Sequence, residues 1–200
     1  MSSSATDTLP AWAREPGVTL PLSGLLPEAG EEGRFATVEM VPGAGLGSAY
    51  SVMLPAGWTS HVGRSEGGPL SDTVFATLGV FSPGPGDQVF PLVGFGVVRA
   101  PRAGTVKAFF EAYCAADGLE IVAQRTVGLL VGGAVEGFVV KRTAIGVLAT
   151  RLVLFEGGRC LYALSGTARL EDYRAAARTI GLALCSFELR WPGVQRMPLE

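Results

Sequence analysis

The sequence predicts an α+β domain in which an antiparallel β-sheet is flanked by helices. Three observations lead to this prediction. Short segments rich in β-branched and aromatic residues are separated by glycine and proline signals for turns and hairpins. Two further segments have the apolar spacing of amphipathic helices. Several strands are apolar on both faces, as in residues 152–155, which indicates a sheet that is covered on both sides.

The chain has the size and composition of one folded domain. It contains 200 residues, of which 48% are hydrophobic and 17% charged, so the apolar surface is sufficient for a large core. We expect a single domain over residues 35–190 and a short tail over residues 191–200. Residues 1–34 contain four prolines and predict an irregular N-terminal arm, whose leucines would dock on the domain or on a second copy.

The first half of the domain predicts four strands, at residues 35–41, 50–54, 73–81 and 89–98. A glycine-rich loop at residues 43–47 connects the first two strands. Residues 58–72 form the longest irregular stretch between predicted elements. Gly94 and Gly96 lie inside the fourth strand, where paired glycines favour close backbone packing.

The second half predicts two helices around four strands. Thr105 is the expected N-cap of the first helix and Gly118 its stop. Strands are expected at residues 119–127, 134–143, 147–156 and 159–165, with two-residue hairpins at 132–133 and 157–158. A helix at residues 170–184 follows, and residues 187–189 suggest a terminal strand or cap. Because two helices do not easily cover both faces of such a sheet, the arm, residues 58–72 or a partner must complete the second layer.

The charge pattern argues against nucleic-acid and membrane partners. The formal net charge is -2 and no run of like charge exists, so nothing steers the chain to nucleic acid or to an anionic membrane. No apolar segment reaches the roughly 18 residues of a membrane span, and the first residues lack a signal peptide, so we expect a cytoplasmic protein. Arginine provides all basic residues except Lys107 and Lys141, and asparagine is absent, which is typical of a high-GC bacterial genome.

The residues that commonly bind metals are sparse. Cys114, Cys160 and Cys185 have no metal-ligand spacing and the chain has one histidine, so we expect buried free thiols and no metal or cofactor. A site made of carboxylates alone stays open, with Glu111, Glu136 and Glu156 as its raw material.

Residues 63–67 match the G-x-S-x-G pattern of a nucleophile elbow, with Ser65 as the serine. An elbow needs a helix after the serine and a triad histidine later in the chain. Here Gly68-Pro69 follows, and His61 precedes the serine. A serine hydrolase that uses Ser65 and His61 is therefore an alternative hypothesis. The glycines at 43–47 resemble a dinucleotide loop, but Ser48 stands at its sixth position and no helix is predicted after it.

The candidate binding residues are Trp58, His61 and Arg64, which fall together in the irregular stretch 58–72. A tryptophan beside a titratable histidine can form a binding surface. The alternative is that Trp58 caps the core and that His61 is an ordinary surface residue.

The order of elements resembles the superfamily that includes PsbP proteins, Mog-type Ran-binding proteins, and DcrB-like and LpqN-like bacterial proteins. The resemblance rests on the strand and turn at residues 50–58, the helix around 109–114, the two glycine hairpins and the terminal helix that ends at 184–187. It covers roughly residues 49–189. It implies an α/β/α sandwich and, for most members, a non-enzymatic binding role whose partner differs from branch to branch.

We therefore expect a non-catalytic protein-binding module rather than an enzyme. The DcrB-like branch includes chaperones for the hydrophobic segments of type VI secretion effectors, so the resemblance implies a chaperone or adaptor with such an effector as partner. This assignment is an analogy from fold. The alternatives are the serine hydrolase and a structural subunit of a larger assembly, and a homo-oligomer is possible.

Overall fold

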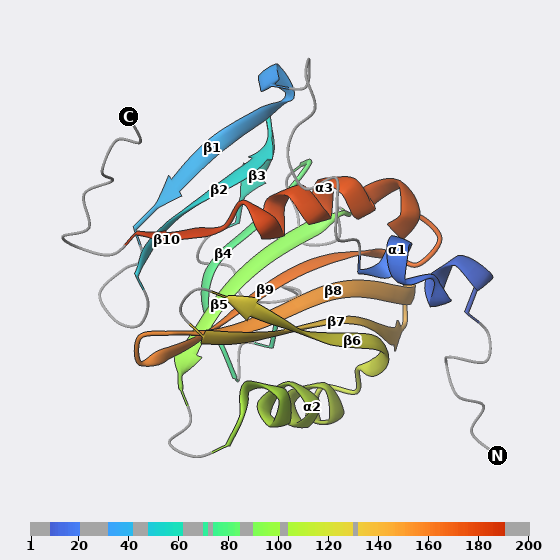
Figure 1. Ribbon diagram of the computed structural model, residues 1–200. Coiled ribbons are helices and arrows are strands. Elements are labelled where there is room, and N and C mark those ends of the chain that lie inside the picture. Colours follow the sequence, from blue (N-terminus) through green and yellow to red (C-terminus); the bar gives the residue numbers. More distant parts are fainter. Residues whose placement is uncertain are drawn as a thin grey trace.

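The computed structural model contains a seven-stranded sheet, a three-stranded sheet and two long helices (Figure 1). It describes residues 9–20, 32–41, 48–61, 70–71, 74–84, 90–100, 104–129 and 132–190. The helices are α1 (Pro16–Thr19), α2 (Val106–Ala116) and α3 (Tyr173–Cys185), with 3-10 turns η2 (Ala11–Arg14) and η3 (Glu32–Arg34). The strands are β1 (Phe35–Met40), β2 (Ala49–Pro55), β3 (Thr59–Ser60), β4 (Ala76–Ser82), β5 (Leu92–Arg99), β6 (Glu120–Leu129), β7 (Gly132–Thr143), β8 (Gly146–Gly157), β9 (Cys160–Arg169) and β10 (Glu188–Arg190).

Every pair of neighbouring strands is antiparallel. The large sheet has the order β3-β4-β5-β9-β8-β7-β6, and the small sheet has the order β1-β2-β10. Figure 1 shows α2 on one face of the large sheet and α3 on the other. The predicted α+β class with an antiparallel sheet between helices is confirmed.

Two apolar cores lie on the two faces of the large sheet. The α2-side core joins α2 to β7, β8 and β9, and Leu70 and Phe75 pack into it from the segment before β4. The α3-side core is larger and includes Tyr50, Phe81, Phe95, Phe138, Tyr173 and Ile180. The strands thus bury side chains on both faces, as their apolar sequence predicts.

The N-terminal arm supplies part of the layer that two helices alone do not provide. Ala13 and Leu20 are buried in the α3-side core. Residues 9–20 therefore dock on their own domain. The structure differs from the prediction of an irregular arm here, because η2 and α1 are helical. Their turns close through backbone bonds such as Ala13 N to Pro10 O at 3.0 Å, which pair polar groups beside an apolar surface.

Helix α2 begins and ends at the predicted residues. The Thr105 side chain accepts a hydrogen bond from Ala108 N at 3.1 Å, which satisfies an N-terminal donor. At the other end Gly118 has φ +67° and Leu119 N donates to Cys114 O at 2.8 Å, a closing bond that needs the left-handed glycine.

Helix α3 begins three residues later than predicted, at Tyr173. Arg169 still pairs with Leu148, and Leu170 N donates to Val147 O at 2.8 Å, so β9 and the residue after it continue along β8. The apolar character of Leu170 marks packing against the α3-side core rather than membership of the helix.

Both glycine hairpins are displaced by one or more residues from their predicted positions. Gly132 and Gly133 pair with Leu129 and Gly128, so both lie in β7 and not in the turn. Gly157 pairs with Cys160, which leaves residues 158–159 as the turn. Gly158 carries φ +64°, the conformation that a two-residue hairpin turn requires and glycine adopts without strain.

Candidate binding groove

The predicted candidates Trp58 and His61 lie on described residues, directly before and directly after β3. Trp58 is half-buried against the α3-side core, so its capping role is the one that the structure shows. His61 follows β3, where its N donates to Val80 O at 2.7 Å. Arg64 and Ser65, with the rest of residues 62–69, lie outside the described residues, as does the predicted loop at 43–47.

His61 is bonded to a buried serine, Ser82, with 2.7 Å between Nε2 and Oγ. The Ser82 hydroxyl donates its only proton to Gly84 O at 2.6 Å, so the His61 Nε2 must carry a proton and donate. A histidine whose Nε2 already carries a proton cannot accept the proton of the Ser82 hydroxyl at that atom. Ser82 is also 0% exposed, so its hydroxyl does not face solvent. This pair therefore anchors the chain after β4 and is not an arrangement for nucleophilic attack.

The three carboxylates proposed as raw material for a metal site are engaged or separated. Glu136 is buried between two arginines, Glu111 pairs with Lys107 on α2, and Glu156 is exposed on β8. Among the described residues, no group of three or more potential metal-ligating side chains comes together.

The cysteines are free, as predicted, but only Cys114 is buried. Burial, followed by the nearby Asp117 and Glu111 carboxylates, raises the pKa of the Cys114 thiol to about 12. Cys160 is half-buried and Cys185 is exposed, so the prediction of burial was wrong for Cys185 and only partly right for Cys160. Cys185 ends α3, where its apolar neighbours in sequence face the core and it does not.

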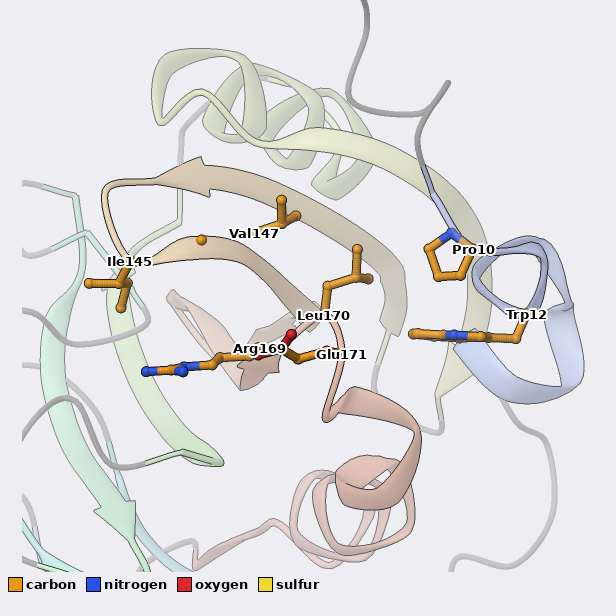
Figure 2. Close-up of a pocket in the computed structure, with 8 residues that line it drawn as sticks. Pro10, Trp12, Ile145, Val147, Arg169, Leu170 and Glu171 are labelled. Carbon is orange, nitrogen blue, oxygen red and sulfur yellow. The ribbon is translucent and has the colours of Figure 1, made fainter.

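The structure instead forms an open groove with a volume of about 400 Å³ at one end of the sheet, which we call the Trp12 groove (Figure 2). Three segments far apart in sequence build it: η2 with the residue before it, the β7–β8 turn with the start of β8, and the end of β9 with the residues that follow. Its lining residues are Pro10, Trp12, Ile145, Gly146, Val147, Arg169, Leu170 and Glu171. Figure 2 shows Pro10 and Trp12 on one side, Ile145 at the opposite end, and Val147 and Leu170 between them.

Trp12 is a rigid wall of the groove. Its ring stacks on the ring of Tyr173 with centroids 6.1 Å apart and planes 4° apart, and it meets the edge of Phe138 at 6.4 Å. Tyr173 is itself buried in the α3-side core, so both supporting rings are fixed. The wall is thus set before any ligand arrives.

The opposite end of the groove presents Ile145 to solvent. Its side chain is 43% exposed, and among the described residues only Val41 is another exposed large hydrophobic side chain. Thr143 fixes this turn, because its Oγ1 accepts from Ile145 N at 3.3 Å and donates to Gly146 O at 2.9 Å. Gly146 has φ +115°, which a side chain at that position would disfavour. The turn therefore holds Ile145 outward.

A buried ionic cluster ties the N-terminal segment to the sheet beside this groove. Arg125 Nε donates to Glu136 Oε2 at 2.6 Å, and Arg151 Nε donates to Glu136 Oε1 at 2.5 Å. Arg125 also donates from Nη1 to the carbonyl of Leu20 at 2.7 Å. These residues lie side by side on β6, β7 and β8, so the cluster holds the end of α1, and with it Trp12, over the sheet.

Sequence reasoning missed the Trp12 groove. It placed residue 12 in an arm, Val147 at the start of a strand and Leu170 at the start of a helix. Ile145 was the one local signal, since an isoleucine between two strands, next to a glycine, is an apolar residue at a turn. The walls themselves depend on which segments meet in space.

Comparison with known proteins identifies similar folds but assigns the chain to no family. No family model matches the sequence, and no curated protein matches it. Cyanobacterial PsbP from Synechocystis sp. PCC 6803 is similar in structure, with a TM-score of 0.53 and 11% identity over 85% of this chain and 99% of that chain. A protein from Bacteroides thetaiotaomicron has a TM-score of 0.48 and 13% identity over 80% of this chain and 50% of that one. The chain therefore has a PsbP-like fold, and the predicted resemblance is confirmed at the level of fold.

Within the part of the chain that the structure describes, no helix has both the length and the apolar character needed to cross a bilayer. The predicted cytoplasmic location stays a prediction.

Proposed function

We propose that this protein is a non-catalytic protein-binding module and that its docking site is the Trp12 groove. The observation that carries the proposal is the open apolar channel between the rigid Trp12 wall and the exposed Ile145. The occupant is a short segment of another protein that places apolar side chains on Trp12, Val147 and Leu170. The PsbP-like fold is compatible with a binding role through the resemblance described above.

The lining favours a protein segment over a small metabolite. Sites for small molecules enclose most of the ligand and aim several polar groups at it. The Trp12 groove is open, and the ionisable residues that line it are Arg169 and Glu171, one of each sign. An aromatic side chain that is partly buried in a groove and bordered by charged residues is instead typical of the energetic centre of a protein interface.

Crosslinking from the groove in the native host tests the proposal. A photoreactive phenylalanine analogue replaces Ile145 in one strain and Lys107, an exposed residue of α2 on the other face of the sheet, in a control strain. We expect one discrete protein adduct from position 145 and none from position 107. Absence of an adduct at 145, or the same adduct at both positions, would reject the groove as a docking site.

The recovered partner then provides a quantitative check in vitro. Ile145→Asp places a carboxylate on the apolar lining and should weaken the binding of that partner by tenfold or more, about 1.4 kcal/mol. Lys107→Ala should leave the affinity unchanged. Equal affinities for the two variants would contradict the proposal.

The narrower hypothesis concerns the identity of the partner. As a chaperone or adaptor for a type VI secretion effector, the protein should give an effector as the adduct from position 145. Any other adduct would reject the effector hypothesis and leave the binding function in place. The serine hydrolase alternative has a separate test, namely labelling by a fluorophosphonate probe that disappears in Ser65→Ala.

A further inference from the structure

The outer edge of β1 is a second interaction surface, away from the Trp12 groove. β1 is the last strand of the small sheet, and among the described residues no strand pairs with its outer side. Figure 1 places β1 and α1 at opposite sides of the molecule. A free strand edge is a template for another strand, because its backbone donors and acceptors are already aligned.

One hydrogen bond shows which residues of β1 point their backbone N–H and C=O groups towards β2 and which point them outward. Ala56 N donates to Arg34 O at 2.8 Å, so residue 34 turns its backbone groups towards β2. Because these directions alternate along a strand, Phe35, Thr37 and Glu39 turn theirs outward. Pro55 agrees with this assignment, since it stands opposite Phe35 and has no N–H to offer.

The β1 edge lacks three of the usual protections against pairing, namely lysine, proline and a β-bulge. It contains no lysine and no proline, and its register with β2 runs without a bulge from Phe35 to Met40. Its one charge, Glu39, is paired across the sheet with Arg190 Nη2 at 2.8 Å. Val41, directly after the strand, is 83% exposed. An edge with these properties favours association.

We propose that β1 pairs antiparallel with β1 of a second copy, around a two-fold axis at Val38, so that one sheet continues through both subunits. A two-fold axis perpendicular to the sheet keeps the solvent-facing sides of the two subunits on the same side of the continued sheet. Each residue then pairs with one that faces the same way, so one residue lies at the axis and pairs with its own copy. An axis at Glu39 would oppose two carboxylates, and an axis at Thr37 would set Phe35 against Glu39 of the partner subunit. The axis at Val38 sets Phe35 against Val41 of the partner subunit and Thr37 against Glu39 of the partner subunit.

This register uses the exposed apolar residue and avoids like charges, which is why we prefer a second copy to another protein. In the dimer β1 continues by one residue to Val41, which then shares a face with Phe35 because six residues separate them. Their contact removes apolar surface from water in both subunits. The outward backbone groups of Thr37 and Glu39 meet in hydrogen-bonded pairs. The inference does not depend on the Trp12 groove.

Two substitutions at one exposed position test both the dimer and its register. Thr37→Lys places an ammonium opposite Glu39 of the partner subunit, and Thr37→Glu places a carboxylate there. Sedimentation equilibrium should find the wild-type chain and Thr37→Lys as dimers, with a dissociation constant weakened about tenfold or more in Thr37→Glu. Circular dichroism and melting temperature verify that both variants fold.

Each other outcome overturns the proposal. A wild-type chain that stays monomeric up to its solubility limit would leave the edge to another protein or to none. Dissociation of both variants would indicate an axis at Thr37, where two lysines or two glutamates repel. Dimerisation of all three chains would place the interface elsewhere.

Discussion

Ile180 of α3 lies directly over Gly166 of β9, so that a Cβ added at residue 166 would overlap its Cγ2 methyl group. Phe110 of α2 lies over Gly137 of β7 in the same way on the other face of the sheet. Both large side chains are 0% exposed. Each long helix is thus seated by one bulky residue on a glycine of the sheet, which lets the helix approach closely.

Gly166→Ala should lower the free energy of unfolding by about 1–3 kcal/mol, because the Ile180 side chain that the new Cβ would overlap is β-branched and fully buried. Urea denaturation measures the change. Gly133→Ala is the matched control, since a Cβ there meets nothing within 4 Å, and it should be neutral or slightly stabilising. In a double-mutant cycle with Ile180→Ala, the double variant should lose less stability than the sum of the losses in the two single variants. Strict additivity would contradict the contact.

Glu136→Gln should destabilise the protein by about 3 kcal/mol, because it removes the charge that balances two arginines in a buried site. Arg151 is 2% exposed, and its buried Nη1 has no hydrogen-bond partner among the described residues, so the charge of Arg151 is balanced mainly by Glu136. Denaturation of the variant measures the loss. Glu111→Gln, in an exposed pair on α2, is the control and should change stability by less than about 0.5 kcal/mol. Similar losses of stability in both variants would show that the buried ionic cluster contributes no more to stability than the exposed pair.

Trp12→Ala should cost about 2–3 kcal/mol of stability and release the N-terminal segment from the sheet, because it removes the stack on Tyr173 and the contact with Phe138. Chemical denaturation and protease cleavage near residue 20 would report the two effects. Ala11→Ser, at the exposed neighbouring position, should leave both unchanged. If Trp12→Ala kept full stability, the arm would not be part of the core.

Stability should fall with rising pH above the ordinary pKa of a thiol, and Cys114 should account for part of the fall. In the unfolded chain the thiol ionises near its ordinary pKa of 9.0, whereas in the fold the raised pKa keeps it protonated to about 12. The folded state then binds more protons, so the free energy of unfolding decreases across this window by up to about 1.4 kcal/mol per pH unit. Urea denaturation between pH about 8 and about 10 should show a shallower fall in Cys114→Ala. Equal slopes would refute the assignment.

Much of the fold could be predicted because its signals are local. The Thr105 cap, the Gly118 stop and the strand at residues 35–41 each depend on a few neighbouring residues and agree with the structure to within a residue. The errors arose where distant partners decide. Leu170 lies outside α3 because its backbone N–H donates to Val147 O. The hairpin turns differ from the predicted positions because the register of the paired strands determines which residues form the turn.

The candidate site was predictable to a much smaller extent. Trp58 and His61 share an irregular stretch of sequence, and in the structure Trp58 packs on the α3-side core while His61 bonds to Ser82. Arg64 lies outside the described residues, so the predicted group of three stays a prediction. The groove was not predicted, because Trp12, Val147 and Leu170 come together only when the arm, β8 and the end of β9 meet.

The sequence by itself determined the α+β class, the number and order of most elements, and a sheet buried on both faces, since periodicity and capping are properties of short segments. The tertiary structure decided which face each helix covers, where the arm docks, how Glu136 is neutralised, and which apolar residues stay exposed. The physical reason is that these features depend on strand order and on side chains from distant segments that share one face, which local spacing does not encode.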